Sequence, residues 1–183
     1  MTIEAGPGEL FTTTARAADV PALVALINGA YRGDGSQRGW TSEGHLIAGP
    51  RISVESVREL IAAPDSAILV VRAQSGLFAC AHVSKQAGGV CYLGLLTVRP
   101  SLQGSGLGRQ MLAAAESYAR SAFGARILEM QVVDAREELI AWYERRGYVQ
   151  SGEQRPFPYD DQHLGVPRRD DLRFVVLRRQ IAP

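Results

Sequence analysis

The chain has 183 residues, of which 46% are hydrophobic and 21% are charged, an ordinary composition for a folded globular domain. Its 20 lysine and arginine residues nearly balance 19 aspartate and glutamate residues, which argues against binding nucleic acid by bulk electrostatics. The N-terminus lacks the basic start and apolar run of a signal peptide, and no apolar run approaches the roughly 20 residues of a membrane-spanning helix. We therefore predict one cytoplasmic domain over residues 1–183, with no nucleic-acid or membrane partner.

Two helices are predicted in the first third of the chain. A capping aspartate and an early proline introduce apolar residues at helical spacing, which predicts a helix over Asp19–Tyr31. Ser53 opens a second short helix, which Pro64 stops. Residues 32–52, between them, are rich in glycine and have no sustained period. We predict that they form a loop.

Three strands follow and form a meander. They are predicted over Ala67–Ala73, Leu77–Lys85 and Val90–Val98, because turn residues separate them. The last of these strands is apolar at nearly every position, which is typical of a strand covered on both faces. We therefore expect Val90–Val98 to be central in its sheet.

The pattern changes again in the second half of the chain. We predict a helix over Leu107–Ala122, a strand over Arg126–Val133 and a helix over Arg136–Arg146 that ends at a left-handed glycine. Residues 151–171 contain three prolines and have no period, and a connector of this length usually lines a site or an interface. A strand over Leu172–Arg179 closes the predicted fold.

The two cysteines fall on neighbouring antiparallel strands. The tight turn near residues 87–89 places Cys80 opposite about residue 95 and Cys91 opposite about residue 84. The thiols would then not face each other. We predict two buried free thiols in a reducing compartment.

The strongest chemical signal is the turn from Gln103 to Arg109, where a buried strand runs into three spaced glycines that open a helix. Such glycines let ligand oxygens approach backbone N–H groups at the positive end of the helix dipole, which makes an anion site. Arg109 stands where a P-loop needs lysine, and a dinucleotide fingerprint would need a small residue at Arg109 or Met111. The alternative is a glycine turn that serves chain geometry only.

Two motifs resemble the GNAT family of N-acetyltransferases. Residues 103–108 fit its Q/R-x-x-G-x-G/A signature, and Tyr143, Gly147 and Tyr148 fit its later tyrosine-x-x-x-glycine-aromatic element. The resemblance extends over about residues 12–179 and includes a bacterial subgroup of unknown acceptor. It implies an α/β fold with a mixed central sheet of about six or seven strands, splayed between strands four and five and flanked by about four helices.

The resemblance also implies acetyl-CoA as co-substrate. The backbone at Leu96, Thr97 and Val98 would bind the pantetheine arm as an added strand would. The pyrophosphate would be held by the amides of a set of seven residues: Gln103, Gly104, Ser105, Gly106, Leu107, Gly108 and Arg109. Arg99 and Arg109 are either charge partners of the pyrophosphate or solvated surface charges.

A catalytic tyrosine is implied by the same resemblance. Tyr143 would protonate the departing thiolate or hydrogen-bond to it. The alternative is that its ring packs in the core and its hydroxyl finds a backbone partner. Several relatives carry a carboxylate early in strand four as general base, but Cys91, Tyr92 and Leu93 occupy the corresponding positions here.

Three other residues are therefore candidates for the general base: Glu43, His82 and Asp134. For His82 the alternative is a structural histidine, and an amine that arrives neutral needs no strong base. The acceptor pocket is predicted between the loop over residues 31–51 and residues 157–171, with Tyr31, Trp40 and Glu43 as its contacts. For Glu43 the alternative is a solvated glutamate that caps a turn.

We predict an N-acetyltransferase that transfers the acetyl group of acetyl-CoA to a primary amine of a small molecule or peptide by direct attack. The alternative is a non-catalytic module that binds or senses acyl-CoA, and an O-acyl acceptor is left open. No metal is expected, because the three histidines lack mutual ligand spacing. A homodimer is left open as a partner.

Overall fold

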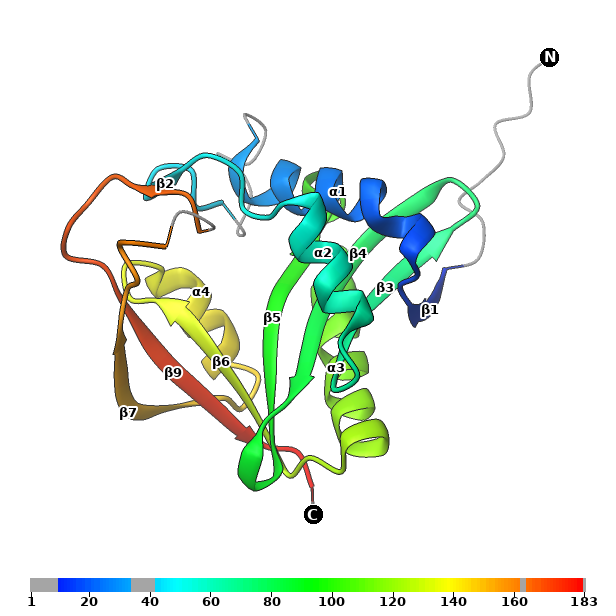
Figure 1. The fold of residues 1–183 in the computed structure, drawn as a ribbon. Helices are drawn as coiled ribbons and strands as arrows, with labels where there is room; N and C mark the ends of the chain where they lie inside the picture. The colour runs from blue at the N-terminus through cyan, green and yellow to red at the C-terminus, as the bar shows by residue number, and fades with distance from the viewer. Residues whose placement is uncertain (1–9, 34–41, 162–163, 183) are drawn as a thin grey trace.

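The computed structural model describes residues 10–33, 42–161 and 164–182 (Figure 1). The helices and strands of these residues follow in chain order: β1 Phe11–Thr14, α1 Val20–Arg32, β2 Ile47–Ala48, α2 Val54–Ala62, β3 Ser66–Ala73, β4 Gly76–Lys85, β5 Val90–Val98, α3 Leu107–Phe123, β6 Ile127–Val133, α4 Glu137–Glu144, β7 Val149–Pro156, β8 Val166–Pro167 and β9 Arg173–Gln180.

The main element is a seven-stranded mixed sheet with the strand order β1-β3-β4-β5-β6-β9-β7. Neighbouring strands are antiparallel except β5 and β6, which run parallel. The predicted α/β class is confirmed, with seven strands and, among the described residues, four α-helices. Strand β5 occupies the middle position, as its continuous apolar run predicted.

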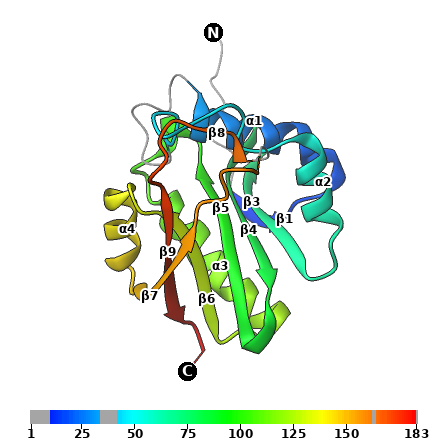
Figure 2. The same cartoon turned by 60° about the vertical axis from the view of Figure 1, so that its left-hand side comes forward.

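Helices cover both faces of the meander β3-β4-β5 (Figure 2). Alternate residues of β3 divide between the two faces: Leu69 and Val71 pack in the cluster that contains α3, while Ile68 and Val70 pack in the cluster that contains α1 and α2. Because side chains alternate along a strand, a strand covered on both faces needs apolar residues at successive positions. This explains the apolar runs of the meander.

Local signals set the helix ends. The Ser53 hydroxyl accepts a hydrogen bond of 3.0 Å from the backbone N–H of Ser56 and so caps α2. Gly124 ends α3 with φ of 61°, and Gly147 follows α4 with φ of 84°. Glycine adopts this left-handed conformation without steric cost. None of the described helices combines the length and apolar character needed to cross a bilayer.

The prediction of an aperiodic segment over residues 151–171 was wrong in part. Most of β7 and all of β8 lie in it; β7 pairs with β9 at the edge of the sheet, and β8 pairs with β2. Strand β7 is exposed along almost its whole length, so it has no apolar alternation for a sequence pattern to show. The short edge strand β1 was missed for the same reason.

The cysteines are both buried and free, as predicted. Their register differs from the prediction, since Cys91 pairs with Lys85 and Cys80 pairs with Thr97. The pairing of β4 with β5 is shifted by one residue from the predicted register at Cys91, and the bulge in β5 shifts it by one more residue at Cys80. Burial raises the pKa of the Cys80 thiol to about 12 and that of Cys91 to about 11, so both stay protonated.

Candidate active site

The sheet opens between its fourth and fifth strands, β5 and β6. The two strands pair only where Val90–Tyr92 meets Ile127–Glu129. Beyond this point they separate, as Figures 1 and 2 show, and residues 93–98 of β5 have no partner on β6. The predicted splay is confirmed. It leaves a strand edge with unpaired backbone groups, which is suited to an extended ligand.

A β-bulge lies at the same edge. His82 pairs with Gly94 and Cys80 with Thr97, so one residue of β4 opposes two residues of β5, Leu95 and Leu96. Leu95 has φ of 51°, the one positive φ of a non-glycine residue in the described part of the chain. Such strain costs on the order of 1 kcal/mol or more and tends to cluster at functional sites.

A cavity of about 260 Å³ lies where β5 and β6 begin to separate. Strands β5 and β6 line it together with the end of α1, the segment before β2, α4 and the start of β9. It brings together four residues that sequence reasoning selected: Tyr31, Glu43, Leu96 and Tyr143. Apolar side chains make up much of the remaining wall.

Tyr143 lies on α4, and its side chain is buried against two aromatic rings. The ring centroids of Trp142 and Tyr148 lie 5.0 and 5.7 Å from its own. Its hydroxyl makes no hydrogen bond to any other described residue, although the residue lines the cavity. Burial raises the pKa of Tyr143 well above its usual value, and the nearby phenol of Tyr31 raises it further. The hydroxyl therefore stays protonated and can donate to a ligand.

Tyr31 connects α1 to the bulge. Its hydroxyl donates a hydrogen bond of 3.2 Å to the carbonyl oxygen of Leu96, and the residue is 8% exposed. Thr97 donates from its own hydroxyl to the carbonyl oxygen of Leu95 at 2.8 Å. These two bonds occupy the carbonyl groups of both bulge residues and hold β5 in its irregular shape.

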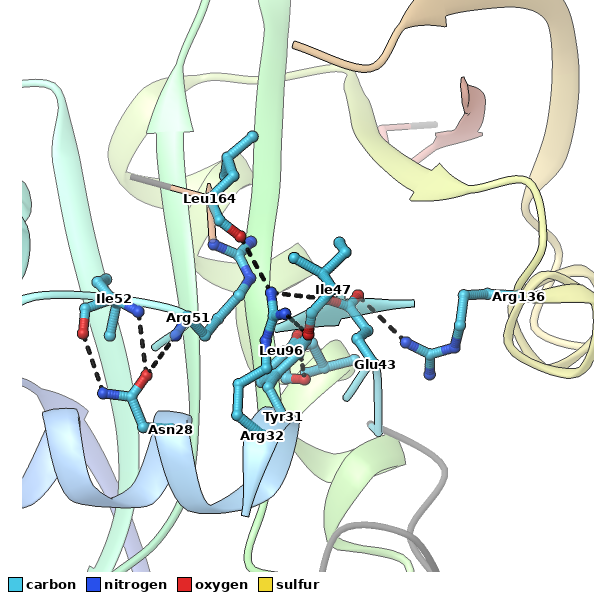
Figure 3. A network of polar contacts seen from close by, with 10 residues as sticks. All are labelled: Asn28, Tyr31, Arg32, Glu43, Ile47, Arg51, Ile52, Leu96, Arg136 and Leu164. Atoms are coloured by element: carbon cyan, nitrogen blue, oxygen red, sulfur yellow. Dashed lines mark hydrogen bonds and ion pairs between the residues drawn. The ribbon is translucent and has the colours of Figure 1, made fainter. Parts of the chain in front are cut away.

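Glu43 lies at the centre of a polar network in the cavity wall (Figure 3). Its two carboxylate oxygens lie 3.1 Å from Nη1 of Arg136 and 3.6 Å from Nη2 of Arg32. Arg32 also donates to the carbonyl oxygens of Ile47 and Leu164. The three charged side chains are at most 12% exposed. Glu43 is therefore engaged in a buried network and is not a solvated cap.

The glycine turn before α3 follows the end of β5, beyond the residues of that strand that line the cavity. Gly104 and Gly106 have φ of 87° and 93°, and Gly106 is the N-cap of the 17-residue helix α3. The backbone N–H of Gln110 is the first to donate within the helix, to the carbonyl oxygen of Gly106. The amides of residues 107–109 precede it and find no acceptor in the described part of the chain. Unpaired N–H groups at the N-terminus of a helix are suited to bind an anionic ligand.

Comparison with known proteins identifies this arrangement. The family model described as the Acetyltransferase (GNAT) family matches residues 37–148, which is more than half of the chain. The chain belongs to this family. It is thus an acetyltransferase with acetyl-CoA as co-substrate, as the two motifs predicted. No curated protein sequence matches it.

Solved structures show the same fold at low identity. The ribosomal-protein-S18-alanine N-acetyltransferase of Escherichia coli is 17% identical, with a TM-score of 0.68 and 96% of each chain covered. An N-acetyltransferase of Staphylococcus aureus Mu50 is 15% identical, with a TM-score of 0.68 over 96% of this chain and 100% of that one. The protein yncA of Salmonella typhimurium, solved with its cofactor acetyl-CoA, is 18% identical, with a TM-score of 0.65 and 96% of each chain covered.

Two predicted base candidates of this acetyltransferase do not line the cavity. His82 lies on β4 with Nε2 2.9 Å from the Ser66 hydroxyl, which itself donates to the carbonyl oxygen of Leu60 at 2.7 Å. Burial lowers the pKa of His82 to about 4. Asp134 accepts backbone hydrogen bonds from Ala135 and Arg173 at 2.9 and 3.3 Å. Both side chains thus have structural contacts.

The remaining predicted residues lie as follows. Arg99 donates to the carbonyl oxygen of Leu77 at 2.6 Å and covers the Phe78 ring, so it is not a solvated charge. Arg109 is exposed in the first turn of α3. Trp40 lies outside the described residues. The sequence analysis gave no role to Arg51 or Arg136. Their contacts, with Tyr31 and Glu43, join distant parts of the chain, and no local motif predicts such contacts.

Proposed function

We propose that this acetyltransferase transfers the acetyl group of acetyl-CoA to a primary amine of a small molecule or peptide by direct attack. One observation carries the proposal: the unpaired edge of β5 leads into a cavity lined by Tyr143, whose buried hydroxyl has no partner among the described residues. A ligand that extends along the edge would bring its reactive end to this hydroxyl.

The chain offers two groups of contacts to acetyl-CoA. The backbone of β5 at Leu96, Thr97 and Val98 has no partner on β6 and suits the amide groups of the pantetheine arm. The amides from Gln103 to Arg109 suit the pyrophosphate. No Cβ fills the space at Gly104 or Gly106, which leaves the turn open to ligand oxygens. The bound co-substrate supplies the acetyl group as an activated thioester.

In the proposed transfer, the amine nitrogen forms a bond to the acyl carbon, and the bond between that carbon and sulfur breaks. Tyr143 donates its hydroxyl proton to the departing sulfur and recovers a proton from the amine nitrogen, directly or through water. Its raised pKa keeps the hydroxyl protonated until the sulfur departs.

We propose no dedicated base. Glu43 lines the cavity, but two arginines engage its carboxylate; His82 and Asp134 do not line the cavity. An amine that enters in its neutral form needs only a weak acceptor for its proton. Proximity in the cavity and stabilisation of the leaving group then supply the rate enhancement.

The acceptor space argues against a module that only binds or senses acyl-CoA. Besides Tyr143 and β5, the cavity is lined by Phe157, Leu164 and Phe174, which offer an apolar wall to an acceptor. We also propose a cytoplasmic location, because two free thiols are typical of a protein in a reducing compartment. A homodimer stays a prediction.

The test is a panel of small amines and short peptides incubated with acetyl-CoA. Release of CoA is followed by thiol detection, and a product heavier by one acetyl group is sought by mass spectrometry. Transfer to at least one amine that is lost in Tyr143→Phe supports the proposal. Acetyl-CoA binding without transfer to any amine or peptide would assign the protein to the binding class.

A further inference from the structure

The cavity wall carries positive charge that its own carboxylate does not neutralise. Its charged lining consists of Arg32, Glu43 and Arg51. Glu43 is shared between Arg32 and Arg136, which reaches it from the N-terminal end of α4. Within the described ranges, no carboxylate pairs with Arg51. The charged lining thus holds two arginines and a single glutamate, whose carboxylate is also engaged by Arg136.

Arg51 is held beside the proposed reaction centre. Asn28 of α1 accepts hydrogen bonds from the backbone N–H groups of Arg51 and Ile52, at 2.7 and 3.0 Å, and donates to the carbonyl oxygen of Ile52 (Figure 3). The guanidinium carbon of Arg51 lies 5.4 Å from the ring centroid of Tyr31. The hydroxyl of that ring binds Leu96 in the bulge of β5. One aromatic ring therefore separates Arg51 from the strand edge.

Arg32 adds a second guanidinium with unused hydrogen-bonding capacity. Its side chain is 7% exposed, and its buried Nε–H finds no acceptor in the described part of the chain. Burial lowers the pKa of Arg32; the carboxylate of Glu43 opposes this shift, and the nearby charge of Arg51 adds to it. Two neighbouring guanidiniums in a partly desolvated wall repel each other, and a bound anion relieves this repulsion.

The geometry points to an acceptor that carries a carboxylate beside its amine, as an α-amino acid does, with Arg51 binding the carboxylate next to Arg32. This inference rests on the proposed acetyl transfer and names its substrate class. Guanidinium groups suit carboxylates because their N–H groups match the two oxygens. The apolar wall at Ile47, Phe157 and Phe174 favours an acceptor with an apolar side chain. A polyamine would meet only like charge at Arg51.

The test compares amino acids with the amines that lack only the carboxylate. Suitable pairs are L-methionine with 3-(methylthio)propylamine, L-leucine with 3-methylbutylamine and L-phenylalanine with 2-phenylethylamine; spermidine serves as a polycation. The readouts are kcat/KM from CoA release and the mass of the product. We expect at least one amino acid to exceed its matched amine by about 10- to 100-fold, the range of one charge-assisted hydrogen bond.

Arg51→Gln then tests the residue. It should lower kcat/KM for the preferred amino acid by about 10- to 100-fold and leave the matched amine within about twofold. Arg58→Gln is the control, since Arg58 lies on α2 with its side chain 66% exposed. Binding of acetyl-CoA by calorimetry and the melting temperature report whether each variant is folded.

The outcomes separate the two proposals. Equal or faster acetylation of the matched amines or of spermidine would overturn the carboxylate-bearing acceptor but leave N-acetyl transfer standing. An equal loss for both members of a pair in Arg51→Gln would overturn the role of Arg51. If acetyl-CoA binds and no amine or peptide is acetylated, the proposed function itself is wrong.

Discussion

Oε1 of Glu43 lies 3.1 Å from Nη1 of Arg136, an ion pair between residues 93 positions apart. Arg136 is the N-cap residue of α4, the helix that carries Tyr143. Glu43 also hydrogen-bonds through its backbone N–H to the carbonyl oxygen of Tyr31 at 3.0 Å. The pair therefore ties the helix of the proposed acid to the end of α1, across the cavity.

Glu43→Gln should destabilise the protein, because it leaves two buried guanidiniums without their carboxylate. Loss of one partner from a buried network costs roughly 3 kcal/mol, which urea unfolding can measure. Glu55→Gln is the control, since its pair with Arg58 is exposed and worth about 1 kcal/mol at most. Unchanged stability with loss of the acidic limb of the pH–rate profile would instead make Glu43 the general base.

Tyr143→Phe should lower kcat by roughly 10- to 10⁴-fold with little change in acetyl-CoA affinity, because it removes the proton donor and keeps the ring. Single-turnover kinetics and calorimetry measure the two quantities. Tyr118→Phe is the control: this tyrosine of α3 packs edge-on against Phe123 and does not line the cavity, and its hydroxyl has no hydrogen bond within the described residues. Full activity in Tyr143→Phe would leave the phenol with a packing role only.

Two substitutions at Gly106 separate the effect of backbone strain from the effect of negative charge on CoA binding. Gly106→Ala imposes a side chain on a residue with φ of 93° and costs about 1 to 2 kcal/mol of stability. Gly106→Asp adds a negative charge where the pyrophosphate is proposed to bind. We expect the aspartate variant to lose at least tenfold more affinity for CoA than the alanine variant, by calorimetry. Equal affinities in the two variants would place the pyrophosphate elsewhere.

His82 should make stability depend on pH. Its pKa falls from 6.5 in the unfolded chain to about 4 in the folded one, so the unfolded state binds the proton more readily. The contribution is complete above about pH 6.5, is lost as the pH falls towards 4, and amounts to about 3 kcal/mol. Urea unfolding at pH 7.5 and 5 should show this loss, and His82→Gln, which retains a donor for Ser66, should reduce it. A large fall in kcat for His82→Gln at pH 7.5, with stability intact, would restore His82 as a catalytic candidate.

Local patterns in the sequence determined much of this fold. The apolar run of Val90–Val98 placed the central strand with its observed bounds, because burial on both faces leaves a mark at every position. The glycines before α3 marked the left-handed turn that we propose as the anion site, because glycine adopts a positive φ without steric cost. Both features depend on residues that are close together in the chain, so they can be predicted from the sequence.

Other features were decided only by the tertiary structure. Strand β7 exists because β9 offers it an edge, and its exposed residues show no period. Glu43 pairs with Arg136, and Arg51 lies over Tyr31. No fixed spacing in the sequence predicts either contact. Charged side chains meet wherever the packed elements bring them within a few ångströms, and this distance depends on the whole fold. The arginines of the cavity wall are therefore brought together by the tertiary structure, and the sequence alone did not predict this grouping.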